Sequence, residues 1–200
     1  MKSKYIDASA LAALKKQTRG RGVAPWLPFE VADRTGLRIG DVLKLRAADL
    51  HEDGVHYVAQ KTGKRGVAEV PPYLRRQLDE AARRSPSGWL FPSPYKQGKH
   101  LTRQAAWARL KTAAKRAGVS VDGISPHSLR KCYAVDLYKR KGLRAVQAAL
   151  QHSTSDQTER YALADWFTGE RSAEPLLRRD IDVIVRRVVE VLEAHKSAGE

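Results

Sequence analysis

The sequence predicts a mainly α-helical domain with a small antiparallel β-hairpin or sheet, an α+β fold. Apolar residues recur at helical spacing through most of the chain, whereas residues 54–58 alternate and are rich in β-branched and aromatic side chains. With 200 residues, 42% of them hydrophobic, the chain is long enough to bury a core. Its one cysteine excludes a disulfide framework and suits a reducing compartment.

Three helices are expected in the N-terminal part. Asp7 or Ser9 is placed to cap the first, because short polar side chains accept hydrogen bonds from the free N–H groups of a helix start. Gly36 suits the end of the second, since glycine readily adopts the left-handed conformation there. The three helices are expected from the cap to the Arg19–Gly22 break, from Pro25 to Gly36, and over residues 37–45.

The period changes near Gly54 and predicts a β-hairpin. Its strands are expected over residues 54–58 and 67–70, with a turn at 62–66 and a stop at the following prolines. Helices follow at about 73–84, 102–117, 126–140 and 143–151, with Thr102 and Ser125 as N-caps. After Gly169 a charged linker leads to a last amphipathic helix over residues 180–193.

The charge balance points to a polyanionic partner. Lys and Arg number 37 against 22 Asp and Glu, a net charge of +15, so nucleic acid is the first candidate. No segment resembles a signal peptide or is apolar enough to span a bilayer, which predicts a soluble intracellular protein without a membrane partner. The six histidines show no metal-binding spacing, so no metal site is expected.

His127 and Arg130 are candidate site residues. They lie three apart at the start of a predicted helix, so they share a face where the helix dipole favours an anion. A guanidinium beside an imidazole suits a phosphodiester, because one binds the oxygens and the other carries a proton. Taken alone, the pair also fits a solvated histidine and arginine on a basic helix.

Further segments resemble the motifs of the tyrosine recombinases, the phage integrase family. The resemblance covers roughly residues 5–165, and its motifs occur in the family's order. They are Thr35–Leu45 for the first box, Gln60–Arg65 for the lysine-bearing hairpin, Leu90–Ser93, His127–Arg130 for HxxR, Leu150–Thr154 for the Leu-Gly-His-Ser element, and Tyr161 nine residues beyond His152. Gln151 departs from the family, which usually has glycine there.

The resemblance implies the tyrosine recombinase catalytic-domain fold and DNA cleavage through a covalent 3′-phosphotyrosine. This chemistry needs no ATP or redox cofactor, because the ester keeps the bond energy. It needs no metal, because arginine and histidine groups stabilise the charge that gathers on the phosphate oxygens. The motifs imply a role for each residue. Arg38 and Arg130 would clamp the phosphate, and His152 would donate a hydrogen bond to it. His127 would assist proton transfer, Lys61 would protonate the leaving 5′-oxygen, and Tyr161 would be the nucleophile. Lys61 lies 23 residues after Arg38, which favours it over Lys64 in the same turn.

The remaining expectations concern the surface and the core. Lys64, Arg65, Arg103 and Lys131 are expected to contact the DNA backbone. Asp41 fits either support of the site from behind or plain solvation. The residues expected to pack in the core are Cys132, the tryptophans at 26, 89, 107 and 166, and the tyrosines at 57, 73, 133 and 138.

The expected partners are double-stranded DNA and further copies of the chain in a synaptic tetramer on DNA. No small-molecule substrate is expected, and the expected location is the prokaryotic cytoplasm at the nucleoid. Residues 1–170 would form the catalytic domain. Residues 171–200 would form a linker and a helix that packs on its own domain or on a neighbouring protomer.

Two questions stay open at this point. The family's separate N-terminal helical domain does not fit before Arg38, so the chain is an excised catalytic fragment or resembles short members such as the fimbrial-switch invertases. The alternative functions are a non-catalytic DNA-binding regulator of the same fold and DNA relaxation of the type IB topoisomerase kind.

Overall fold

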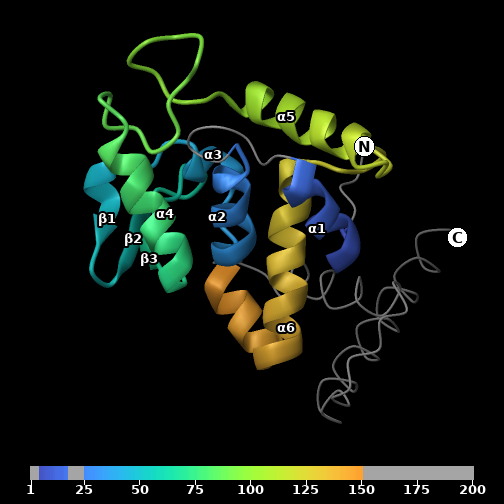
Figure 1. Ribbon diagram of the computed structural model, residues 1–200. Helices are drawn as coiled ribbons and strands as arrows, with labels where there is room; N and C mark the ends of the chain where they lie inside the picture. Colours follow the sequence, from blue (N-terminus) through green and yellow to red (C-terminus); the bar gives the residue numbers. More distant parts are fainter. Residues whose placement is uncertain (1–4, 18–24, 151–200) are drawn as a thin grey trace, which may run out of the picture. The chain divides into compact units, whose positions relative to one another are not determined.

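The structure is a computed structural model that describes residues 5–17 and 25–150. The chain divides into two compact units, residues 1–133 and 134–200, and each is described by itself. The elements are α1 (Ala8–Gln17), α2 (Leu27–Thr35), α3 (Ile39–Val42), the 3-10 helix η1 (Ala47–Asp49), β1 (Leu50–His51), β2 (Gly54–Val58), β3 (Arg65–Ala68), α4 (Pro72–Arg83), α5 (Arg103–Arg116) and α6 (Pro126–Leu150) (Figure 1). The predicted fold class, mainly helical with a small antiparallel sheet, is confirmed.

The sheet has three antiparallel strands in the order β1-β2-β3, one more than the predicted hairpin. The extra strand, β1, is only two residues long and carries no detectable alternation. The prediction that the returning strand covers residues 67–70 is wrong, because β3 begins at Arg65 and ends at Ala68. The Ala59 N–H donates to the Lys64 carbonyl over 2.8 Å and closes the turn there, so Arg65 is already a paired strand residue.

Helix caps define where the elements begin. Asp7, rather than Ser9, caps α1, since its Oδ1 accepts a hydrogen bond from the Ala10 N–H over 2.8 Å. The Thr102 hydroxyl oxygen accepts one from the Ala105 N–H over 3.1 Å, as predicted.

The third helix is shorter than predicted and covers only residues 39–42. In the second unit, α6 is interrupted at Gly142, where φ is 75°, between the two helices expected from the sequence.

The core of the first unit is aliphatic, and α2 and α4 carry much of it. Fully buried side chains include Phe29, Val31, Leu74, Leu78 and Leu110. No helix within residues 5–17 and 25–150 has the length and apolar character that a bilayer span requires.

The tryptophans only partly follow the prediction of a core position. Trp26 is buried, whereas Trp107 is 45% exposed, and the prediction for it is wrong. The buried residues of α5 are Ala106, Leu110, Ala113 and Ala114. Trp107 lies off this stripe and faces solvent under the Lys111 ammonium group. Trp89 is partly buried, with the Arg46 guanidinium 3.9 Å from its ring centroid. Trp166 lies outside the described residues.

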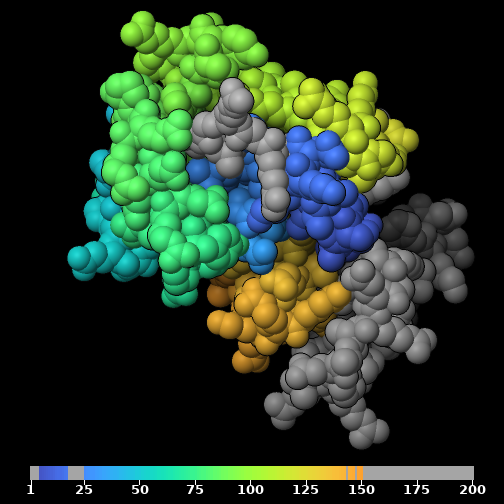
Figure 2. All heavy atoms as spheres, viewed as in Figure 1, coloured from blue at the N-terminus to red at the C-terminus, as the bar shows by residue number. Residues whose placement is uncertain are grey.

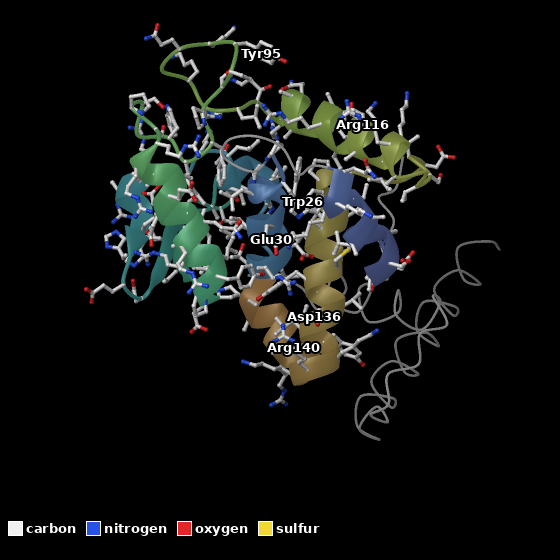
Figure 3. All side chains as sticks on the ribbon, viewed as in Figure 1. Trp26, Glu30, Tyr95, Arg116, Asp136 and Arg140 are labelled. Atoms are coloured by element: carbon white, nitrogen blue, oxygen red, sulfur yellow. The ribbon has the colours of Figure 1, made fainter. Side chains whose placement is uncertain are left out.

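The connection between α4 and α5 contains a strongly exposed loop. In Figure 2 its green atoms project at the top of the view, and Figure 3 labels Tyr95 there. Tyr95 is 86% exposed, whereas Leu90 and Phe91 earlier in the same segment are buried. The segment Leu90–Ser93 is therefore anchored by its first two residues, while the loop beyond it faces solvent.

A buried carboxylate joins three helices of the first unit. Glu30 on α2 is 3% exposed (Figure 3). Its Oε2 lies 2.5 Å from the Lys15 ammonium of α1, and its Oε1 accepts a hydrogen bond from the Tyr73 hydroxyl of α4 over 2.9 Å. Burial raises the pKa of Glu30, but the bonds from Lys15 and Tyr73 outweigh it and hold the pKa below its usual value. The ionised carboxylate therefore stabilises the fold.

Glu30→Gln is expected to lower the free energy of unfolding by about 1–3 kcal/mol at pH 7, because it removes the buried negative charge that faces Lys15 and Arg34. A carboxylate whose pKa is lowered by folding loses its contribution as the pH falls below the usual value of 4.5. The difference from the wild type should thus shrink below about pH 4.5 in urea unfolding. Glu80→Gln, at an exposed pair with Arg84, is the control and should change little. A pH-independent difference for Glu30→Gln would contradict this role.

Candidate active site

Arg38 is placed by the way α2 ends. Gly36 adopts the left-handed conformation with φ 68° and reverses the chain. The Thr35 hydroxyl donates to the Val31 carbonyl over 2.6 Å, and the next residue, Leu37, is buried in the core. Arg38 follows as the extended N-cap residue of α3 and is half-buried. The Thr-Gly-Leu-Arg motif is thus a helix stop that fixes the backbone of Arg38.

His127 and Arg130 are held by a capped helix start. Ser125 caps α6, and its hydroxyl oxygen accepts a hydrogen bond from the His127 N–H over 3.2 Å. Ser128 is fully buried, and its hydroxyl donates to the Gly123 carbonyl over 3.2 Å. Arg130 is 4% exposed, and its Nη1 donates to the Gly36 carbonyl. The two candidate motifs, 94 residues apart, are therefore joined directly.

Lys61 belongs to the turn between β2 and β3. The Ala59 carbonyl accepts hydrogen bonds from the Thr62 and Gly63 N–H groups, over 3.1 and 2.7 Å. Gly63 has φ 68°, which a residue with a side chain adopts only at a cost. Lys61 is exposed in this turn.

Five basic residues from separate segments line one cleft of about 410 Å³. They are Arg38 before α3, Lys61 in the hairpin turn, Arg103 at the start of α5, and His127 and Arg130 in the first turn of α6. The other lining residues are Ile39, Gly40, Asp41, Gln60 and Pro126. Cationic groups that converge on one hollow favour an anion of phosphate size.

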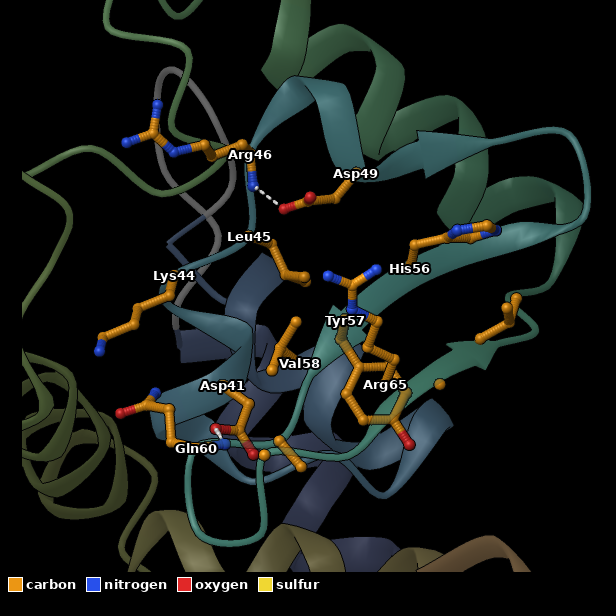
Figure 4. A pocket seen from close by; sticks show the side chains of 14 residues that line it. Asp41, Lys44, Leu45, Arg46, Asp49, His56, Tyr57, Val58, Gln60 and Arg65 are labelled. Carbon is orange, nitrogen blue, oxygen red and sulfur yellow. Dashed lines mark hydrogen bonds between the residues drawn. The ribbon is translucent and has the colours of Figure 1, made fainter.

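Lys64, Arg65 and Lys131 are not among the residues that line this cleft. Arg65 lines a second hollow of about 840 Å³, together with Lys44, Arg46 and Asp49 (Figure 4). The cleft and the hollow share Asp41 and Gln60 as lining residues.

The electrostatics of the cleft act on His127 and Tyr57. Desolvation first, and then the positive charges of Arg130, Lys131 and Arg38, lower the pKa of His127. The imidazole is therefore neutral near pH 7. Burial raises the pKa of Tyr57, which is half-buried as predicted and feels the charges of Arg130, Asp41 and Arg38.

Asp41 and Gln60 connect the elements of the cleft. Asp41 is 5% exposed, so the solvation alternative is wrong. Its Oδ1 accepts a hydrogen bond from the Gln60 N–H over 3.1 Å (Figure 4). Gln60 is not among the predicted site residues, and its position directly before Lys61 is the signal that the sequence holds.

Two of the six expected catalytic residues, His152 and Tyr161, lie outside the described residues, as does the expected C-terminal helix. The structure brings the other four, Arg38, Lys61, His127 and Arg130, to one cleft.

The chain belongs to the phage integrase family, whose model matches residues 7–166. Among relatives, tyrosine recombinase XerD of Rhizobium meliloti is 35% identical over 140 residues, which cover 66% of this chain and 45% of that protein. XerD of Pseudomonas aeruginosa is 31% identical over 165 residues, covering 78% of this chain and 54% of the relative. The chain thus spans about half the length of these relatives.

Solved structures share the fold. A lambda integrase dimer bound to a COC' core site gives a TM-score of 0.71 at 18% identity, covering 89% of this chain and 64% of the other. The XerH recombinase bound to palindromic difH substrate gives 0.69 at 18% identity, covering 82% and 51%. The tyrosine recombinase catalytic-domain fold expected from the motifs is confirmed.

The titration of His127 tests the electrostatics of the cleft. Its imidazole should titrate below the usual value of 6.5 in the folded protein, in an NMR titration assigned with His127→Gln. Lys131→Gln should raise the midpoint toward 6.5, because it removes one positive charge near the ring. Unfolding in urea is the reference and should restore the ordinary midpoint. A folded-state midpoint at or above 6.5 would show that the cleft does not repel a second proton.

Proposed function

We propose that this chain is the catalytic part of a site-specific tyrosine recombinase, which cleaves and rejoins double-stranded DNA through a covalent 3′-phosphotyrosine. The observation that carries this proposal is the convergence of Arg38, Lys61, His127 and Arg130 on one cleft. A protein that only binds DNA needs a basic surface, but it does not need an acid, a base and a paired arginine clamp in one hollow.

The arginines bind the scissile phosphate. Arg38 and Arg130 approach its non-bridging oxygens, on which negative charge gathers as the phosphorus becomes five-coordinate. Arg130 is the more rigid of the two, since its guanidinium is buried and already bonded to the Gly36 carbonyl. A donor fixed in this way needs little reorganisation when charge develops, and this lowers the barrier.

Proton transfers complete the reaction. The Tyr161 oxygen bonds to phosphorus while the bond to the 5′-oxygen breaks, and the electron pair stays on that oxygen. The Lys61 ammonium protonates the 5′-oxygen, and the neutral imidazole of His127 takes the phenol proton. His152 donates a hydrogen bond to the phosphate. Rejoining reverses these transfers with the 5′-hydroxyl of another strand, and the bond energy is kept in the ester, without metal or ATP.

DNA contacts extend beyond the cleft. Lys64, Arg65 and Lys131 contact flanking phosphates, whereas Arg103 contacts a phosphate from inside the cleft.

The chain assembles with further copies on DNA, and residues 171–200 follow a catalytic domain of residues 1–170. Support comes from the DNA-bound lambda integrase dimer and the DNA-bound XerH of the same fold. The place of action is the cytoplasm, at the nucleoid, where the DNA is.

Covalent capture tests the reaction. The full chain is incubated with nicked suicide duplexes that carry a randomised core, and adducts are separated on a denaturing gel and sequenced. The wild type should form an adduct, and Tyr161→Phe should form none while its Kd for DNA stays the same, because only the nucleophilic oxygen is lost. An adduct that persists in Tyr161→Phe, or a wild type that forms none, contradicts the proposal.

The products of the captured sites distinguish the alternatives. Recombined duplexes from two adduct-forming sites support a recombinase. Relaxation of supercoils without exchange supports the topoisomerase alternative, and sequence-specific binding without an adduct supports the regulator.

DNA affinity should fall steeply with salt, because a net charge of +15 implies several phosphate contacts. A filter-binding titration between about 50 and 200 mM salt should show a loss of about 10³-fold or more for roughly six contacts. Lys64→Gln should reduce the slope of log Kd against log salt by about one contact. A nearly flat salt dependence would mean that phosphate contacts do not dominate binding.

A further inference from the structure

Gln60 joins the turn that carries Lys61 to the segment that carries Arg38. Its side-chain Nε2 donates to the Gly40 carbonyl over 2.7 Å. Its backbone N–H donates to Asp41 Oδ1 over 3.1 Å (Figure 4). Gly40 and Asp41 are the second and third residues after Arg38. Both hydrogen bonds therefore leave the hairpin and end on α3, beside the arginine of the clamp.

The turn needs such an anchor. Its own hydrogen bonds, from Thr62 and Gly63 to the Ala59 carbonyl and from Ala59 to the Lys64 carbonyl, fix its shape but not its place. Ala59 is buried, but every residue from 60 to 65 is exposed, so core packing does not hold the tip of the hairpin. Two hydrogen bonds at the start of the tip are what tie it to α3.

Asp41 strengthens this anchor and extends it to Arg38. A buried carboxylate is costly unless hydrogen-bond donors reach it, and the Gln60 N–H is such a donor. The backbone N–H of Asp41 donates to the Arg38 carbonyl over 2.8 Å. Asp41 thus bonds the Arg38 backbone on one side and the residue before Lys61 on the other.

We propose that Gln60 is a positioning residue that holds Lys61 at the distance from the arginine clamp at which its ammonium group protonates the leaving 5′-oxygen. This inference rests on the proposed function. A general acid works within hydrogen-bond reach, and a displacement of about 1 Å costs about 100-fold in rate. Gln60 itself touches neither the phosphate nor the nucleophile in this mechanism.

Gln60→Met tests the inference, because methionine keeps the length of the side chain but has no donor for the Gly40 carbonyl. Single-turnover cleavage is measured on a captured site and on the same site with sulfur in place of the bridging 5′-oxygen. The sulfur leaves as a thiolate without a general acid, because the pKa of a thiol is far lower than that of an alcohol. Gln60→Met should cleave normal DNA about 10–100-fold more slowly and recover to within about threefold of the wild type on the sulfur substrate.

Two controls make this pattern specific. Gln77→Met, the same substitution at an exposed position on α4, should leave both rates unchanged. Arg38→Ala should be slow on both substrates, because its work is on the non-bridging oxygens. Gln60→Glu, which also lacks the donor, repeats the test with a polar side chain in case Gln60→Met unfolds, and thermal unfolding checks the fold of each variant.

The outcomes separate this inference from the proposed function. Equal slowing of Gln60→Met on both substrates, or no slowing on normal DNA, overturns the positioning role. If Lys61→Ala is rescued by sulfur and neither Gln60 variant is, the inference fails while the mechanism stands. If Lys61→Ala is not rescued, the general-acid role of Lys61 fails and the role of Gln60 fails with it.

Discussion

The hydrogen bond from Arg130 to the Gly36 carbonyl is the constraint on which the site depends. A guanidinium that is 4% exposed requires an acceptor, because an unpaired buried charge is far more costly than a lost contact. Gly36 supplies one, since its left-handed conformation ends α2 and turns its carbonyl out of the helix ladder. The helix stop that places Arg38 thus also orients Arg130, so the two halves of the clamp cannot shift independently.

The cleft gathers positive charge from separate segments of the chain. Arg38, Lys61, Arg103 and Arg130 place four cations around one hollow, with the carboxylate of Asp41 beside them. Desolvation first, and then the positive charges of Arg130, Lys131 and Arg38, lower the pKa of His127 beside this hollow. In the proposed function, a phosphate of the DNA brings negative charge into this hollow.

The parts of the structure that sequence could predict are those fixed by neighbours along the chain. The end of α2 follows from Gly36, and the shared helix turn of His127 and Arg130 follows from their spacing. Predictions failed where distant contacts decide. β1 exists only because Leu50 and His51 pair with β2, and Trp107 is exposed because alanines fill the buried stripe of α5. The contact from Gln60 to α3 spans 20 residues and leaves no local pattern.

The register of the hairpin decides which lysine reaches the cleft. Lys64 accepts the closing hydrogen bond from Ala59 through its carbonyl, so it belongs to the strand end, next to the paired Arg65. Lys61 lies inside the turn, directly after the anchor that Gln60 makes on α3. The two kinds of cation then match the elements that carry them. The flat, rigid fork of arginine suits phosphate binding, and Arg38 and Arg130 lie at helix starts, whereas lysine carries a single nitrogen on a long stem, which suits proton delivery. In the proposed mechanism, a hairpin tip joined to α3 by two hydrogen bonds carries the proton donor, and helix starts next to the core carry the phosphate clamp.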